Sequence, residues 1–234
     1  MTAVCGVDGC KAGWIAVFKD LDSGACSWQL FRSARELLAV AATTVATGID
    51  IPIGLPDRGP RECDREARRL LGRGRGSSVF PAPIRPVLAA PTYEKACAVR
   101  SEIEKKKLSR QLWNIVPKIR EVDAALQVEP ALHATIHEVH PEVSFFALAG
   151  ERPMTYNKKA RAGRDERLAV LEPVFGRVLA SALGDRRALG SDEDDILDAF
   201  AVLWTAERIA AGKAHTIPAT PPTDSCGLRM EIVV

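Results

Sequence analysis

The chain has 234 residues, of which 47% are hydrophobic and 26% charged, and its formal net charge is +2. These are ordinary values for a globular protein, and so small a net charge gives no sign of a nucleic-acid partner. No uncharged apolar run reaches the roughly 18 residues that span a bilayer, so we expect no membrane partner. The six cysteines form no Cys-x-x-Cys pair, and no secretory signal is visible, which favours a reducing cytoplasm without disulfides.

The N-terminal region has the pattern of an antiparallel meander. Apolar runs cover residues 3–8, 14–19 and 26–31. The turn sequences GCKAG and DLDSG separate these runs. Short apolar runs divided by such turns predict three consecutive β-strands.

A helix and a fourth strand are predicted next. Ser33 followed by Glu36 is a capping-box pattern at the start of SARELLAVAA, which predicts a helix. The stretch VATGIDIPIG then predicts a short buried strand ended by prolines. A helix that joins strands of one sheet is typical of an α/β fold with a mixed sheet.

Residues 57–127 differ in composition from the flanking regions, because they are rich in Arg, Lys, Pro and helix formers. We predict helices over residues 61–72 and 92–111, with the proline-rich segment 77–91 between them. This region is interpreted as a helical insertion or cap on the sheet, within one domain that covers residues 1–234.

The last third of the chain returns to elements that belong with the sheet. ATIHEVH predicts a strand, and PEVSFFALAG predicts a helix with Pro141 at an early position. Further helices are predicted over residues 164–183 and 191–211. The tail LRMEIVV is expected to form a last strand or a docked terminus.

Three aspartates stand in apolar surroundings where a chain of this kind rarely carries charge. Asp8 ends the run AVCGV, Asp50 interrupts VATGIDIPIG, and Asp198 lies within DDILDAFAVLWTA. An ionised carboxylate in such surroundings costs several kcal/mol unless a cation compensates it. Protein cations are scarce beside these positions in the sequence, so we expect a bound divalent metal.

The acids of residues 192–198 divide into two groups. Helical geometry of about 100° per residue places Asp194, Asp195 and Asp198 on one side of the helix. Helix capping from Ser191 and the helix dipole account for the first-turn acids, residues 192–194. Asp198 lies beyond the first turn, so Asp195 and Asp198 are predicted to belong to the metal site.

Seven segments resemble those of a known family. They are GVDGCKAGW, IDIPIGLP, RECDREAR, SSVFPAPIR, QLWNIVPKIREVD, EVHPEVSF and DDILDAFAVLWTAERI. The family is an uncharacterised bacterial and archaeal one, usually described as predicted ribonuclease H-like nucleases related to the Holliday-junction resolvases. The resemblance runs from residue 5 to about residue 210.

This resemblance implies a fold and a set of acids. The fold is a ribonuclease H-like mixed sheet with a β-β-β-α-β-α core, flanked by helices. Its acids lie on the first strand, the fourth strand and a late helix, which by position are Asp8, Asp50, and Asp195 with Asp198. The nuclease superfamily often has Glu on the fourth strand, and Asp50 is one methylene shorter.

Four further side chains are candidates for the same site. Alternation along ATIHEVHPEV places Glu138 and His140 on one face, where both can approach metals. His140 can also orient the attacking water or protonate a leaving group. Lys118 and Arg120 in PKIREVD are predicted to contact a phosphate of the substrate.

Two basic stretches bear on the partner. The stretch from Arg58 to Gly76 contains seven arginines and three acids, and the stretch from Arg100 to Arg120 contains seven basic residues and two acids. They are interpreted either as surfaces that follow a phosphate backbone or as solvated helix faces of mixed charge.

The function expected from these features is metal-dependent hydrolysis of a nucleic-acid phosphodiester, in DNA or RNA, by two Mg²⁺ or Mn²⁺ ions. Asp8, Asp50, Asp195 and Asp198 would be the ligands. Two alternatives stay open: a nucleotide-binding phosphotransferase related to the actin and sugar-kinase proteins, and a non-catalytic nucleic-acid-binding module. The oligomeric state is also open, a homodimer included.

Overall fold

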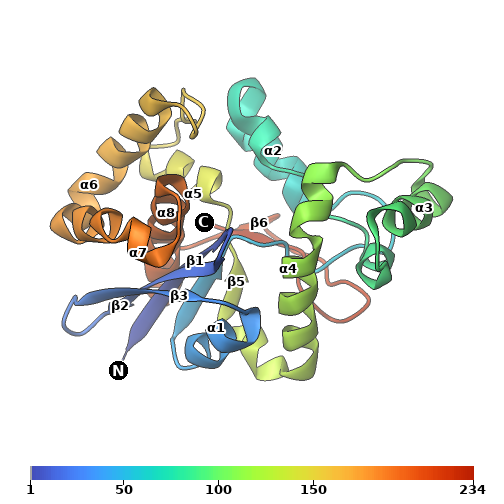
Figure 1. Cartoon of the computed structure of the whole chain (residues 1–234), viewed down its shortest axis with the longest axis horizontal. Coiled ribbons are helices and arrows are strands. Elements are labelled where there is room, and N and C mark those ends of the chain that lie inside the picture. Colours follow the sequence, from blue (N-terminus) through green and yellow to red (C-terminus); the bar gives the residue numbers. More distant parts are fainter. Residues whose placement is uncertain (1) are drawn as a thin grey trace.

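A computed structural model describes residues 2–234 and contains a five-stranded sheet, a two-stranded sheet and their flanking helices (Figure 1). The elements in chain order are β1 (Ala3–Cys10), β2 (Gly13–Asp20), β3 (Cys26–Phe31), α1 (Ala34–Ala41), β4 (Ala46–Ile49), α2 (Glu62–Arg75), η1 (Gly76–Ser78), η2 (Arg85–Ala89), α3 (Tyr93–Glu104), α4 (Arg110–Val128), η3 (Pro130–Ala134), β5 (Ile136–Glu138), α5 (Pro141–Leu148), α6 (Arg161–Gly184), α7 (Arg186–Leu189), α8 (Glu193–Ala210), β6 (Thr216–Ile217) and β7 (Ile232–Val233).

The main sheet is mixed, with the strand order β3-β2-β1-β4-β5. The first three strands form the predicted antiparallel meander, and β4 runs parallel to both β1 and β5. The expected α/β class and the chain order β-β-β-α-β are therefore confirmed.

Helices cover both faces of this sheet (Figure 1). Alternation along β1 sends Cys5 and Val7 into the hydrophobic core with α1 and α4, whereas Val4 packs in a second core with α6 and α8. Gly6 and Asp8 follow the same alternation as Val4. They therefore lie on the face that α8 covers.

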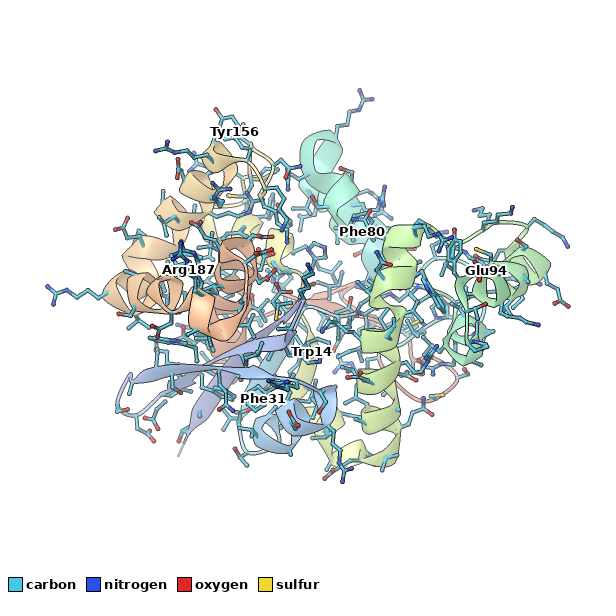
Figure 2. All side chains as sticks on the ribbon, viewed as in Figure 1. Trp14, Phe31, Phe80, Glu94, Tyr156 and Arg187 are labelled. Carbon is cyan, nitrogen blue, oxygen red and sulfur yellow. The ribbon has the colours of Figure 1, made fainter. Side chains whose placement is uncertain are left out.

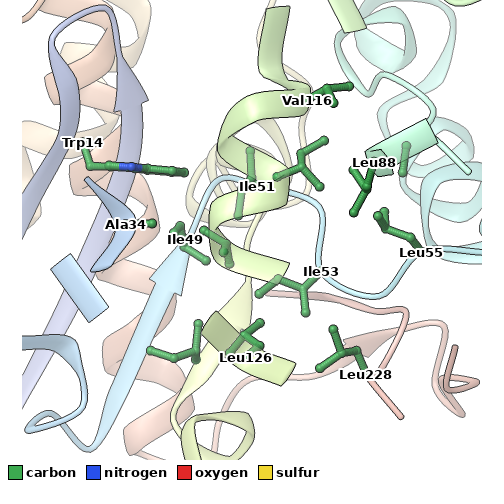
Figure 3. Packing of buried hydrophobic residues seen from close by; sticks show 14 of the residues in the cluster. Trp14, Ala34, Ile49, Ile51, Ile53, Leu55, Leu88, Val116, Leu126 and Leu228 are labelled. Atoms are coloured by element: carbon green, nitrogen blue, oxygen red, sulfur yellow. The ribbon is translucent and has the colours of Figure 1, made fainter. Parts of the chain in front are cut away.

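The region 57–127 supplies one layer of the core as well as outlying helices. Val116 and Leu126 of α4 pack in one buried cluster with Ile49 and Ile51 (Figure 3). Helix α4 thus covers the sheet directly, while α3 lies farther from it at the edge of the molecule (Figure 1).

The single helix predicted over residues 92–111 is wrong. Helix α3 ends at Glu104, because Lys105 adopts a left-handed conformation with φ of 60°. Helix α4 starts anew after Ser109, whose side chain accepts a hydrogen bond from the Leu112 amide at 3.1 Å. Three consecutive lysines hid this break from the sequence pattern, since lysine is a good helix former.

The C-terminal elements follow the predictions closely. Helices α6 and α8 cover the ranges 164–183 and 191–211 to within a few residues. The tail forms β7, which pairs with β6 through Thr216 and Val233. All six cysteines are free. Within residues 2–234, no helix is both long and apolar enough to cross a membrane.

Candidate functional site

Two glycines allow α8 to lie directly on the sheet. A Cβ added to Gly6 on β1 would approach the backbone of Ala199 and Leu203 to well under 3.0 Å. A Cβ added to Gly48 on β4 would lie 2.7 Å from Cγ1 of Val202. Real side chains do not tolerate such distances, so only glycine permits this close contact between helix and strands.

The same packing brings three aspartates together. Asp8 and Asp50 each follow one of these glycines by two residues, so both project toward α8. The amide of Asp50 donates a hydrogen bond to the Val7 carbonyl at 2.9 Å, which places the two acids side by side where β1 and β4 end. Asp198 lies on α8 directly before Ala199 and about one turn before Val202, two of the residues that contact the glycines.

The three carboxylates affect one another strongly. Burial raises the pKa of Asp8 well above its ordinary range, and the charges of Asp50 and Asp198 raise it further. Burial likewise raises the pKa of Asp50, and the charges of His140 and Lys158 partly offset this. Asp198 is only 2% exposed, and burial raises its pKa to about 6. These shifts indicate a site in which added positive charge is stabilising.

Lys158 is the cation of this site, and sequence reasoning missed it. It lies in the irregular segment between α5 and α6, and its ammonium forms an ion pair with Asp198. A second carboxylate, that of Asp194, lies 3.7 Å away. Burial by itself lowers the pKa of Lys158, but the charges of Asp198, Asp8 and Asp50 raise it well above its ordinary value.

The charge of the site remains unbalanced in spite of this lysine. When Asp8, Asp50 and Asp198 are ionised, three negative charges surround one ammonium. Burial makes such an excess costly, and a divalent cation is the simplest partner that removes it.

The family-model comparison gives a match over most of the chain. The model described as "Protein of unknown function (DUF429)" matches residues 6–223. The chain belongs to the DUF429 family. No curated protein and no solved structure matches it.

At the start of α8 in this DUF429 protein, the acids that cap the helix are not the ones that the sequence predicted. The helix cap is Asp192 rather than Ser191. The Asp195 carboxylate accepts hydrogen bonds from the Asp192 amide at 3.0 Å and from the Ser191 hydroxyl at 3.3 Å. Asp195 therefore takes the capping position that the sequence pattern assigned to Asp194. Its charge still raises the pKa of Asp8, which places Asp195 at the edge of the site.

Asp194 is buried and bound by lysines instead of capping the helix. It accepts a hydrogen bond from Nζ of Lys159 at 2.8 Å. The prediction missed this role because Lys159 lies 35 residues before Asp194 in the sequence.

His140 lies near enough to Asp50 for the two charges to interact. Its charge lowers the pKa of Asp50. Its Nδ1 accepts a hydrogen bond from the Glu142 amide at 3.2 Å, because His140 caps α5. This cap fixes the ring next to the site.

Glu138 is not brought to the three aspartates. It pairs in register with Ile49 of β4, so its side chain lies on the face opposite to that of Asp50. There Arg61 donates to both of its carboxylate oxygens, at 2.6 and 2.7 Å, and the Ile53 amide donates a third hydrogen bond at 2.6 Å. This buried ion pair gives Glu138 a structural role that its position next to His140 in the sequence did not indicate.

Lys118 lies at the edge of the site and Arg120 does not reach it. Lys118 is half-buried, with Nζ 4.3 Å from the ring centroid of Trp14. Figure 2 labels Trp14 near the centre of the view. Burial lowers the pKa of Lys118, and the charges of Asp8 and Asp195 oppose this effect.

The guanidinium of Arg120 is used to hold η2. It donates to the carbonyls of Leu88 and Ala90 at 2.7 and 3.0 Å. The prediction paired Arg120 with Lys118 because they are two residues apart, but on α4 this spacing sends them in different directions.

The donor set fits a hard divalent cation, although the ligands are not arranged around one. Within residues 2–234, no three His, Cys, Asp or Glu side chains are grouped as ready metal ligands. The Lys158 ammonium lies against the Asp198 carboxylate instead. Carboxylate oxygens are what Mg²⁺ and Mn²⁺ prefer, and Asp8, Asp50 and Asp198 supply them.

Proposed function

We propose that this protein is a metal-dependent phosphodiester hydrolase that cleaves nucleic acid with two Mg²⁺ or Mn²⁺ ions. The observation that carries the proposal is the convergence of Asp8, Asp50 and Asp198, from two adjacent strand ends and a helix, in a site with excess negative charge. The chain order β-β-β-α-β adds support, because the ribonuclease H-like core that the sequence resemblance implies begins with the same elements.

The three aspartates would divide the work of holding the ions. The charges of both Asp50 and Asp198 raise the pKa of Asp8, so the Asp8 carboxylate lies near both of these carboxylates. Asp8 would therefore be the ligand shared by both ions, with Asp50 holding one ion and Asp198 the other. Bound ions supply Lewis-acid polarisation of the phosphate and a water of lowered pKa.

Other residues would handle protons and the substrate. His140, beside Asp50, is placed to take a proton from the attacking water or to give one to the departing oxygen. Lys118, at the edge near Asp8, would contact a phosphate oxygen.

The choice of a polymeric substrate rests on the exposed arginines of α2. Arg65 and Arg69 have side chains that are 54% and 68% exposed, and both pair with Glu62. Such surface pairs contribute only about 0–1 kcal/mol, so these arginines remain free to exchange Glu62 for phosphates.

The test compares cleavage of labelled DNA and RNA by the wild type and by Asp8→Asn, each with Mn²⁺. The proposal expects Mn²⁺-dependent cleavage by the wild type and its loss in Asp8→Asn. Asp22→Asn, in the exposed turn between β2 and β3, is the matched control and should cleave normally. Equal background cleavage in wild type and Asp8→Asn contradicts the proposal. ATP binding in calorimetry without cleavage would favour a phosphotransferase instead.

A further inference from the structure

The ammonium of Lys158 lies at the Asp198 carboxylate, where one of the proposed metal ions would bind. Its side chain is 35% exposed, whereas that of its partner Asp198 is 2% exposed. The ammonium therefore reaches from a surface segment into a buried site. Residues 151–160, which carry it, form turns and bends between α5 and α6 rather than regular structure (Figure 1).

The segment is attached mainly at points other than Lys158. The Glu166 carboxylate accepts hydrogen bonds from the amides of Thr155 and Tyr156, at 2.8 and 3.0 Å. Lys159 binds Asp194. Lys158 can therefore change its side-chain conformation while its neighbours keep the backbone in place, because a lysine stem has several rotatable bonds.

We propose that Lys158 is a resident counter-ion that a divalent cation displaces from Asp198, which frees the ammonium to contact the substrate phosphate. This inference rests on the proposed function of the same site. A cation within about 2–2.6 Å of a carboxylate oxygen leaves no room for an ammonium at that oxygen. The two cations therefore compete for Asp198.

Charge balance leads to the same conclusion. Three carboxylates compensate one lysine together with one divalent ion, but not one lysine together with two such ions. Each substrate phosphodiester brings one of the two missing negative charges. Lys158 thus leaves Asp198 with least penalty when metal and phosphate enter together, so metal loading is expected to strengthen when substrate is present.

The experiment measures Mn²⁺ binding by electron paramagnetic resonance and calorimetry, without substrate. Lys158→Met keeps the stem and removes the charge, and we expect its Mn²⁺ dissociation constant to fall by about tenfold, equivalent to about 1.4 kcal/mol. The matched control is Lys159→Met, the adjacent lysine, whose side chain is 64% exposed and bound to Asp194 rather than Asp198. Its Mn²⁺ affinity should stay close to that of the wild type.

A second measurement uses only the wild-type protein, so it does not depend on how a variant folds. Acylation of the Lys158 amine by a lysine-modifying reagent, followed by mass spectrometry, should become faster when Mn²⁺ is added, because the amine leaves its ion pair with Asp198. Unchanged or slower modification of Lys158 would overturn the inference.

The outcomes separate this inference from the proposed function. If the wild type binds Mn²⁺ and Lys158→Met binds it equally or more weakly, the role of Lys158 is refuted and the metal site is kept. Absence of Mn²⁺ binding in the wild type and in Lys158→Met removes both.

Discussion

Replacing Asp198 with Asn should stabilise the metal-free protein at neutral and alkaline pH. The pKa of Asp198 is about 6 in the folded protein, against an ordinary value of 3.8, and this value already includes the attraction of Lys158. A difference of about two units, at about 1.4 kcal/mol per unit, makes the ionised form about 3 kcal/mol less favourable in the fold.

The pH dependence follows from the direction of this shift. Because the folded pKa is raised, the folded state binds more protons than the unfolded state between the ordinary pKa and about 6. The stability that protonated Asp198 contributes is thus present below the ordinary pKa and is lost as pH rises to about 6. Asparagine stays neutral, so Asp198→Asn should be more stable by up to about 3 kcal/mol at about pH 8, and nearly equal to the wild type at about pH 4.

The assay is urea unfolding followed by circular dichroism, with EDTA present at both pH values. Asp224→Asn is the control with the opposite sign. Burial raises the pKa of Asp224, but hydrogen bonds from the Leu55 amide and Arg85 outweigh burial and lower the pKa below its ordinary value. The ionised form of Asp224 therefore stabilises the fold. Asp224→Asn should therefore lose stability at about pH 8. An Asp198→Asn protein that is less stable than the wild type there, or a difference independent of pH, would refute the reasoning.

Three further changes test the packing and the ion pairs. Gly6→Ala forces a Cβ into the backbone of α8 and should cost about 3 kcal/mol or more in urea unfolding, whereas Gly74→Ala, with nothing within 4 Å of the added atom, should be nearly neutral. Arg61→Met leaves buried carboxylates without their partner and should cost about 3–5 kcal/mol, against about 0.5 kcal/mol or less for the exposed Arg65→Met. Glu138→Gln should lower the midpoint of thermal unfolding but leave Mn²⁺ affinity unchanged, and a lost Mn²⁺ site in a folded variant would return Glu138 to the metal ligands.

Local signals were sufficient for most of the regular structure. The pair Ser33 and Glu36 predicted a capped helix, and Ser33 accepts a hydrogen bond from the Glu36 amide at 3.3 Å. The Glu36 carboxylate accepts from the Arg32 amide at 3.2 Å, one residue before the N-cap. The strands of the meander were equally accessible, because β1 and β2 are buried on both faces and so appear as apolar runs between turn sequences.

Part of the site also has a signal in short patterns. The spacing Gly-x-Asp occurs in both strands that contact α8, at Gly6 to Asp8 and at Gly48 to Asp50, and in each case the glycine receives α8 while the acid lies two residues on. The same spacing occurs outside the sheet at Gly163 to Asp165 and Gly190 to Asp192, so it is a signal only within a predicted strand.

The sequence by itself determined which acids stand in apolar surroundings and which elements carry them, because periodicity and capping act over a few residues. Only the tertiary structure decided which cation each acid meets. Lys158 lies 40 residues from Asp198, and Arg61 lies 77 residues from Glu138. A buried charge is compensated by whatever the fold brings within a few ångströms, so partners this far apart in the chain carry no local signal.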